Sequence, residues 1–197
     1  MIIASDFEVA EPVDKVWGFF DDIPQVASCL PGAELTKDLG DDKYEGRVAI
    51  RMGPVRMQFV GTADITERDD AAKRIVVHAA GADEKGRGQA AMIVGATLSA
   101  KGRGTKVAVT QDLQLSGAAA QYGRGMISDV SAILMRDFAA NMQNRIERLE
   151  RGESAEQIAA AAGGSSVSGF AIALRATRMA LTRVFRRFFL PYQPAAS

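Results

Sequence analysis

Hydrophobic and polar residues change their spacing along this chain, and each spacing predicts a different element. Between residues 33 and 115, apolar and polar residues alternate, as in the segment Val55–Phe59, and short turns rich in Gly, Pro and Asp separate the runs. Such alternation predicts about six consecutive antiparallel strands with one dry face. A strand over residues 2–10 and two short helices, over about 12–20 and 23–29, are predicted before them.

A long helical pattern follows the strands, over about residues 118–150. Its apolar residues, among them Ile127 and Ile133, share one broad face opposite Arg124 and Arg136. A curved sheet cannot bury its concave face alone, so we expect the long helix to lie across it. The sequence therefore predicts a single α+β domain over residues 1–150, a sheet wrapped on a helix, with a cavity between them.

The interior of this domain is expected to be rich in methionine, because several methionines fall on the inward phase of the strands and of the long helix. Methionine adapts to irregular guests, so such an interior favours a flexible apolar ligand. An ordinary filled core is the alternative that the pattern leaves open. The residues predicted to line the cavity are Phe20, Met52, Met57, Phe59, Met92, Val94, Tyr122, Met126, Val130, Leu134 and Phe138.

The last 47 residues differ from the domain in composition. We expect a flexible linker over residues 151–166, an amphipathic helix over 167–190 and a disordered end over 191–197. All 24 acidic residues lie at or before Glu156, and five arginines with no acidic residue follow it. On a helical wheel most of the large apolar residues of 167–190 gather opposite the arginines, which is typical of a helix lying in a membrane interface.

The predicted membrane contacts are Phe170, Leu174, Arg175, Arg178, Leu181, Arg183, Phe185, Arg186, Arg187, Phe188 and Phe189. Anionic lipids attract such arginines, and salt weakens that attraction. Docking to a partner protein and packing against the chain's own domain or a second copy are the alternatives.

Catalytic and metal chemistry find little support in the sequence. His78 and Cys29 are the only histidine and cysteine, so a triad, a thiol–imidazole pair and histidine- or cysteine-based metal clusters are excluded. Both residues are expected to be structural or solvent-facing. Paired aspartates such as Asp69-Asp70 fall at turns or helix ends, where they cap and solvate. We predict no catalytic residue and no metal site.

Charge and hydropathy restrict the partners and the location. The part of the chain up to Glu156 carries more acidic than basic residues, which argues against nucleic acid as a partner. No apolar run reaches the roughly 18–20 residues of a transmembrane helix, and the first residues do not resemble a signal peptide. We expect a cytoplasmic protein held peripherally at the inner face of the cell membrane.

The sequence also resembles a known family. Pro12-Val13, Val16-Trp17, Asp22, Pro24, Cys29–Ala33, Gly53–Val55, Phe59, Gly61, Gly104-Thr105, Gly117 and Tyr122–Ile127 are similar to the CoxG family, the G subunits of carbon monoxide dehydrogenase. The resemblance covers about residues 1–150. It implies the START-like (SRPBCC) helix-grip fold.

The resemblance further implies an accessory role. Members of this family are expected to recruit a molybdenum-containing carbon monoxide dehydrogenase, or a related hydroxylase, to the cytoplasmic membrane. An apolar cavity could then hold a respiratory quinone, menaquinone or ubiquinone, with no covalent cofactor. Two alternatives are a cyclase or dehydratase that uses Tyr44 or Tyr122 with carboxylates, and a lipid carrier without an enzyme partner. Fold alone does not decide among them.

Overall fold

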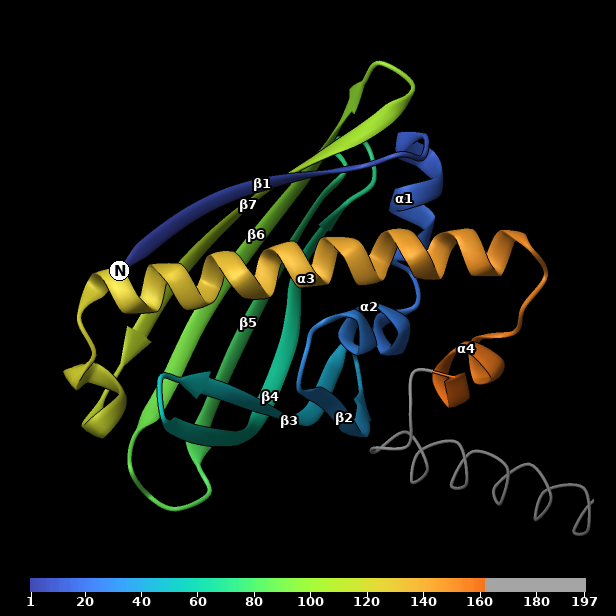
Figure 1. Cartoon of the computed structure of the whole chain (residues 1–197). Helices are drawn as coiled ribbons and strands as arrows, with labels where there is room; N and C mark the ends of the chain where they lie inside the picture. The colour runs from blue at the N-terminus through green and yellow to red at the C-terminus, as the bar shows by residue number, and fades with distance from the viewer. Residues whose placement is uncertain (162–197) are drawn as a thin grey trace, which may run out of the picture.

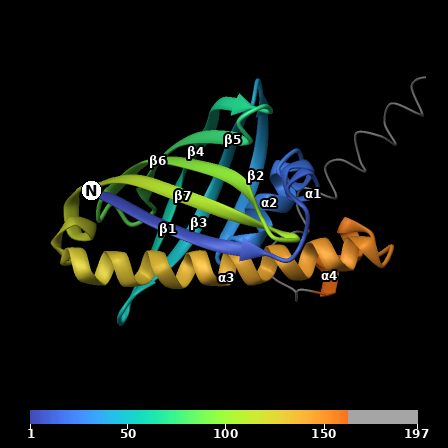
Figure 2. The same cartoon turned by 90° about the horizontal axis from the view of Figure 1, so that it is seen from above.

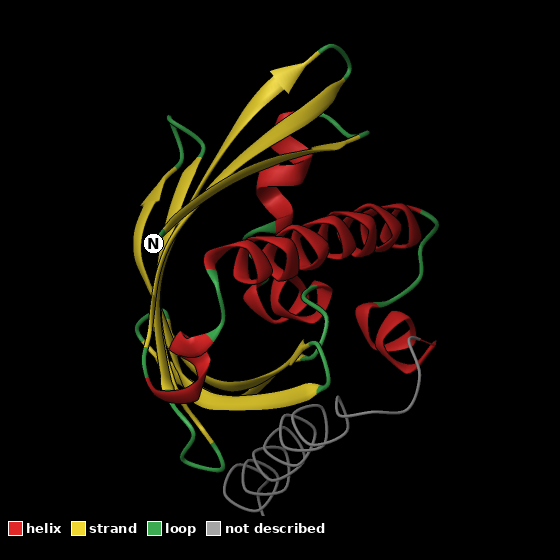
Figure 3. Cartoon of the chain, turned by 60° about the vertical axis from the view of Figure 1, so that its left-hand side comes forward, coloured by secondary structure: helices red, strands yellow, loops and turns green. Residues whose placement is uncertain are grey.

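Seven antiparallel strands form one curved sheet, and a single long helix lies along its concave side (Figures 1 and 3). The computed structural model describes residues 1–161. The strand order is β1-β7-β6-β5-β4-β3-β2. The strands are β1 (Ile2–Val9), β2 (Ala33–Gly40), β3 (Lys43–Met52), β4 (Val55–Asp69), β5 (Arg74–Asp83), β6 (Gln89–Lys101) and β7 (Gly104–Leu115). The helices are α1 (Val13–Phe19), α2 (Ile23–Cys29), the 3₁₀ turn η1 (Gly117–Gln121), α3 (Arg124–Glu150) and α4 (Ala155–Ala161).

The predicted arrangement of sheet and helix is confirmed. The alternating region of residues 33–115 folds into six strands joined by short turns, and each pairs with the strand that follows it. β1 then adds to β7 at the edge, with Ile2 opposite Asp112 and Val9 opposite Thr105. The two short helices lie at one end of the sheet, beside the C-terminal half of α3 (Figure 2).

A row of glycines crosses the bend of the curved sheet. Gly46, Gly61 and Gly81 are directly opposite one another on β3, β4 and β5. A Cβ at Gly46 would lie 2.7 Å from the carbonyl oxygen of Glu34, and one at Gly61 would overlap the carbonyl oxygen of Ala80. Only glycine lets neighbouring backbones approach so closely. The bend brings β2 and β3 round toward α3.

The apolar core consists of two separate clusters. The larger lies where α1, α2 and the C-terminal half of α3 meet the sheet, and it includes Val16, Val107 and Ile146, which are at most 3% exposed. Phe7 and Phe138 pack edge to face in its margin, with ring centroids 5.9 Å apart. The smaller cluster, around Met57, lies at the turn between β3 and β4 and against η1. The middle of the concave face lies between the two clusters.

The long helix begins later than predicted. The expected start near residue 118 is wrong: η1 forms there, Tyr122 is extended, and α3 begins at Arg124 after Gly123. The break lies at Tyr122 and Gly123, whose backbone is extended, with ψ of 133° and 152°. Gly123 is the N-cap residue of α3, and Gly125 lies in its first turn.

Part of the predicted linker is also helical. Ser154 and Gln157 form a capping box, in which the Gln157 amide donates to Ser154 Oγ (3.2 Å) and the Ser154 amide donates to Gln157 Oε1 (2.8 Å). The helix that follows, α4, contacts α3 and buries Ile158, which is 3% exposed. The predicted membrane helix of residues 167–190 and the predicted end of 191–197 lie outside the described residues.

Candidate functional site

The eleven residues predicted to line a cavity divide among the two clusters and the space between them. Phe20, Val94 and Phe138 belong to the larger cluster or pack against it, and Met52, Met57, Phe59 and Tyr122 do so for the smaller one. Met92, Val130 and Leu134 belong to neither cluster and are only half-buried. Met126 is 42% exposed, so its predicted inward orientation is wrong: its neighbour Ile127 is the residue that α3 buries.

The part of the concave face between the clusters carries many small residues. Ala63, Ala79, Met92 and Leu113 lie directly opposite one another across β4, β5, β6 and β7. The neighbouring row contains the three glycines of the bend, followed by Ala90. Large side chains therefore fill both ends of the concave face, whereas its middle carries mostly short ones.

A small polar group faces α3 from this part of the concave face, and sequence reasoning missed it. The hydroxyl of Ser131 donates to Gln111 Oε1 at 3.1 Å, and the two residues are 8% and 6% exposed. Ser5 lies on the neighbouring strand with its hydroxyl buried. A signal was available, because Gln111 occupies the same strand phase as Val107 and Val109, where only apolar residues are expected.

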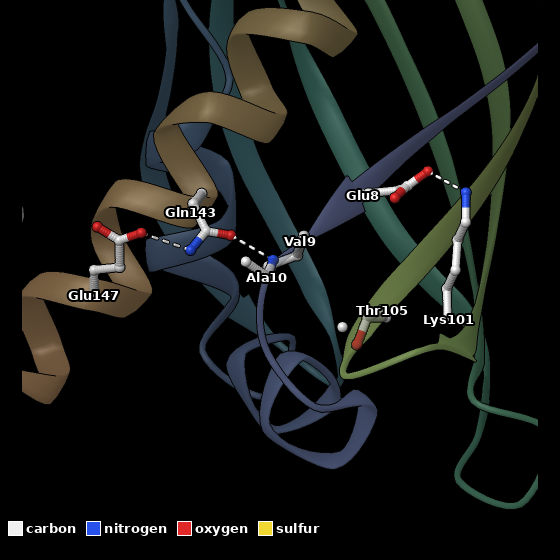
Figure 4. A pocket seen from close by; sticks show the side chains of 8 residues that line it. Glu8, Val9, Ala10, Lys101, Thr105, Gln143 and Glu147 are labelled. Carbon is white, nitrogen blue, oxygen red and sulfur yellow. Dashed lines mark hydrogen bonds and ion pairs between the residues drawn. The ribbon is translucent and has the colours of Figure 1, made fainter.

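Two pockets lie elsewhere in the domain. One, of about 420 Å³, lies where the end of β1 meets β7 and α3 (Figure 4). Its polar groups are already paired: the Ala10 amide donates to Gln143 Oε1 (2.7 Å), Gln143 donates to Glu147 (2.7 Å), and Lys101 pairs with Glu8. The second, of about 350 Å³, lies between α1, α2 and the end of α3, lined by residues such as Phe19 and Leu149. Neither is lined by a predicted cavity residue.

The buried carboxylate of Asp83 is saturated with hydrogen bonds. Its oxygens accept from the Arg87 side chain at 2.7 Å twice, and from the backbone amides of Gln58, Lys85 and Arg87. The Arg87 side chain, followed by these backbone donors, holds the pKa of Asp83 well below its usual range against the opposing effect of burial. A carboxylate kept ionised in this way is structural, since a general acid needs a raised pKa.

The other residues with candidate chemistry are no better placed for it. Burial raises the pKa of the Cys29 thiol to about 11, although the charge of Arg145 opposes the shift, so the reactive thiolate is suppressed. His78 is exposed on the outer face of β5, as predicted. Burial, followed by the charges of Asp38, Asp42 and Asp22, raises the pKa of the Tyr44 hydroxyl, so Tyr44 stays protonated and cannot act as a base at neutral pH.

The residues that carry the family resemblance stabilise local structure. Trp17 is 5% exposed, and its Nε1–H donates to Asp70 Oδ1 at 2.7 Å. Asp22 caps α2 by accepting from the Gln25 amide at 3.1 Å. Gly32 has φ +78°, and any Cβ there would overlap the backbone of β3. Each of these three residues of the family motif therefore has a structural role, and the three do not form a reaction centre.

Two absences apply to the described part of the chain. Within residues 1–161, no helix is both long and apolar enough to cross a membrane. The same residues contain no group of three or more His, Cys, Asp or Glu side chains positioned to hold a metal ion. The eleven predicted membrane contacts, from Phe170 to Phe189, lie beyond this part.

Solved structures define the class of fold. A conserved protein from Geobacillus kaustophilus has a TM-score of 0.67 and 21% identity, covering 75% of this chain and 96% of that one. The Zhui aromatase/cyclase from Streptomyces sp. R1128 has a TM-score of 0.56 and 17% identity, covering 79% and 97%. A START superfamily protein from Mycobacterium smegmatis has a TM-score of 0.50 and 14% identity, covering 75% and 98%. The fold is therefore that of the START-like helix-grip proteins.

The family follows from the sequence itself. No curated protein matches the chain. The profile of the CoxG family, described as the G subunit of carbon monoxide dehydrogenase, matches residues 6–147, which is well over half of the chain. The chain therefore belongs to the CoxG family, and the family resemblance and fold class predicted from the sequence are confirmed.

Proposed function

We propose that this chain is a non-catalytic accessory protein that holds a molybdenum-containing carbon monoxide dehydrogenase-type oxidoreductase at the cytoplasmic face of the membrane. In this proposal it also binds an apolar, lipid-like ligand, a respiratory quinone such as menaquinone or ubiquinone. Family membership supports the accessory role and the enzyme partner. The ligand is supported above all by one observation, the half-buried apolar side chains between the two core clusters.

The space between the clusters has the character of a ligand site. Met92 lies on β6, whereas Val130 and Leu134 lie on α3, the helix along the concave face. None of the three is fully buried. Protein cores are close-packed, so large apolar residues in the middle of a domain are normally buried completely. Side chains left half-buried there remain available to a guest, and small residues on this part of the concave face leave room for it. An apolar ligand entering this space would cover them.

The chemistry of the described residues supports a binding role over a catalytic one. Asp83 is saturated and ionised, Cys29 is held as a thiol, and the pKa of Tyr44 is raised. A cyclase or dehydratase needs an acid or base whose pKa lies near neutral pH and whose side chain is free to meet the substrate. The aromatase/cyclase with the same fold shares 17% identity, which carries the fold and no activity to this chain.

The membrane part of the proposal rests on sequence alone. After Glu156 the chain has five arginines, no acidic residue and several phenylalanines. Each arginine near an anionic bilayer contributes roughly 1 kcal/mol at moderate salt, so five together give substantial attraction that high salt weakens. The ligand and the membrane then belong to one function, because a quinone is stored in the bilayer and a soluble enzyme needs access to it.

Removal of the tail tests the membrane part. We expect full-length protein to co-sediment with vesicles that contain phosphatidylglycerol, and much less with neutral phosphatidylcholine vesicles. A chain that ends at Gly164 should stay in the supernatant with both, while its melting temperature matches that of the intact protein. Unchanged co-sedimentation of the shortened chain would refute the membrane role of the tail.

Native mass spectrometry tests the ligand part. Full-length protein purified from membranes in mild detergent should carry a bound mass that matches a respiratory quinone. Solvent extraction followed by chromatography identifies its ring and tail. A protein that carries no quinone and binds none when it is added would leave a plain anchor, and the ligand would have to be abandoned.

A further inference from the structure

Three polar side chains lie close together on the concave face and on the helix that covers it. Gln111 on β7 accepts a hydrogen bond from Ser131 on α3, through Oε1, at 3.1 Å. Gln111 Nε2 is buried and has no hydrogen-bond partner among the described residues, and the same is true of the Ser5 hydroxyl. Ser5 lies on β1 opposite Val109, so it is the diagonal neighbour of Gln111 on the same face of the sheet.

An unpaired amide in this position is costly, so it calls for an explanation. A buried donor without a partner loses the hydrogen bonds that water gave it in the unfolded chain. Rotating the amide of Gln111 by half a turn does not help, because Ser131 can pair with only one end of it. One end of the Gln111 side chain therefore stays unsatisfied in either orientation.

The surroundings of this group coincide with the proposed ligand space. Gln111 lies directly opposite Val94 on β6, and Met92 is two residues further along the same strand. On α3, Ser131 follows Val130 and lies one turn before Leu134. The unpaired amide therefore belongs to the same part of the concave face as the half-buried apolar side chains that the proposed function assigns to the ligand.

We propose that Gln111, supported by Ser5, is the polar anchor of the ligand site, where its amide donates a hydrogen bond to an oxygen acceptor of an otherwise apolar ligand. Gln111 and Ser131 form no hydrogen bond or ion pair with a charged side chain within residues 1–161, so the acceptor is a neutral carbonyl rather than a carboxylate or phosphate. Ser131 is a positioning residue, since it holds the amide by its other end. This inference deepens the proposed function and depends on it.

A pair of probes of equal shape isolates the hydrogen bond. We suggest 2,3-dimethyl-1,4-naphthoquinone, which has two carbonyl oxygens, and 2,3-dimethylnaphthalene, which has none. Equilibrium dialysis against the full-length protein gives a dissociation constant for each. The variant Gln111→Met keeps the length of the side chain but removes the amide, and Gln114→Met, on the exposed face of the same strand, is the matched control.

We expect Gln111→Met to weaken binding of the quinone by about 3- to 10-fold, the usual effect of one neutral hydrogen bond. Binding of the hydrocarbon should change by less than 2-fold, and Gln114→Met should leave both constants unchanged. In ligand-free protein, Gln111→Met should change the melting temperature little, because it removes the unsatisfied amide but leaves the Ser131 hydroxyl without its acceptor. A residue that only supported the fold would lower it.

Three results would overturn the inference, and they separate it from the proposed function. If both probes bind and Gln111→Met changes their two dissociation constants equally, the amide does not bond to the quinone. The anchor is then absent, although the apolar site is present. If the quinone binds without moving the side-chain amide NMR signal of Gln111, the anchor is likewise excluded. If neither probe binds, the proposed ligand function fails together with the anchor. Ser5→Ala, which should weaken only the quinone, provides a second variant if Gln111→Met does not fold.

Discussion

The proposed ligand space and a filled core predict different costs for truncating a side chain, and two substitutions on α3 test which of them is present. Ile146 belongs to the larger core cluster and is 3% exposed, whereas Leu134 is half-buried and belongs to neither cluster. Both residues lie in the same helix, and replacing either by alanine removes three carbon atoms. The two variants therefore differ mainly in what surrounds the deleted atoms.

The expected costs differ severalfold. Ile146→Ala removes packed atoms and leaves a cavity, which costs about 2–5 kcal/mol of unfolding free energy. Leu134→Ala deletes atoms that are only partly covered and that border open space, so we expect about 1 kcal/mol or less. For a domain of this size, 1 kcal/mol corresponds to about 2–4 °C in melting temperature. A loss of 3 kcal/mol at Ile146 would then lower it by about 6–12 °C.

Urea unfolding of the ligand-free protein, followed by circular dichroism, measures both costs. The dependence of the free energy on urea concentration should be the same for each variant, which confirms that the unfolded states are comparable. Ile133→Ala, at a position that is 49% exposed on the same helix, is the control and should change stability by less than about 0.5 kcal/mol. If Leu134→Ala costs as much as Ile146→Ala, the middle of the concave face is an ordinary filled core and the ligand space does not exist.

Two further predictions concern the framework. Asp83→Asn should lower the melting temperature at pH 7, because Arg87 loses its carboxylate partner. The folded-state pKa of Asp83 is depressed, so its stabilising effect is complete above the unfolded pKa of about 3.9 and is lost at lower pH. In a series of melting curves, the difference in melting temperature between the variant and the wild type should therefore narrow as the pH falls below about 4. Gly61→Ala should lower the free energy of unfolding in urea by about 1–3 kcal/mol, because its Cβ would overlap the carbonyl oxygen of Ala80. Gly95→Ala, where the space is open, should change it very little. Equal effects at the two glycines would contradict the close approach of the backbones at Gly61.

Most of the fold could be predicted because its signals are local and repeated. Alternation between Val55 and Phe59 indicates a strand whatever its partners are, and turns at Gly53 and Gly102 fix where strands end. The error in the start of α3 arose because the helical pattern of the sequence continues across a break in the backbone. Tyr122 and Gly123 are extended, so α3 begins only at Arg124.

The candidate site was less predictable, since it depends on how much of each inward side chain is covered. Strand phase placed Met92 and Val94 on the concave face correctly, but it gave no way to separate the packed Met57 from the half-buried Met92. Polar residues on an inward phase were overlooked because apolar periodicity alone defined the expected interior. Gln111 interrupts the apolar series on β7, and that interruption was the available sign of the buried polar pair that it forms with Ser131.

The positions of the ligand space and the tail constrain how the proposed function would work. α3 has 27 residues and is therefore about 40 Å long. Leu134 lies in its N-terminal half, whereas α4 follows its C-terminal end (Figure 1). Along the chain, the C-terminal half of α3 and α4 therefore separate the proposed ligand space from the proposed membrane helix. A domain held only by such a tail would present its ligand space to the membrane and then to the enzyme, which suits a carrier better than a fixed channel.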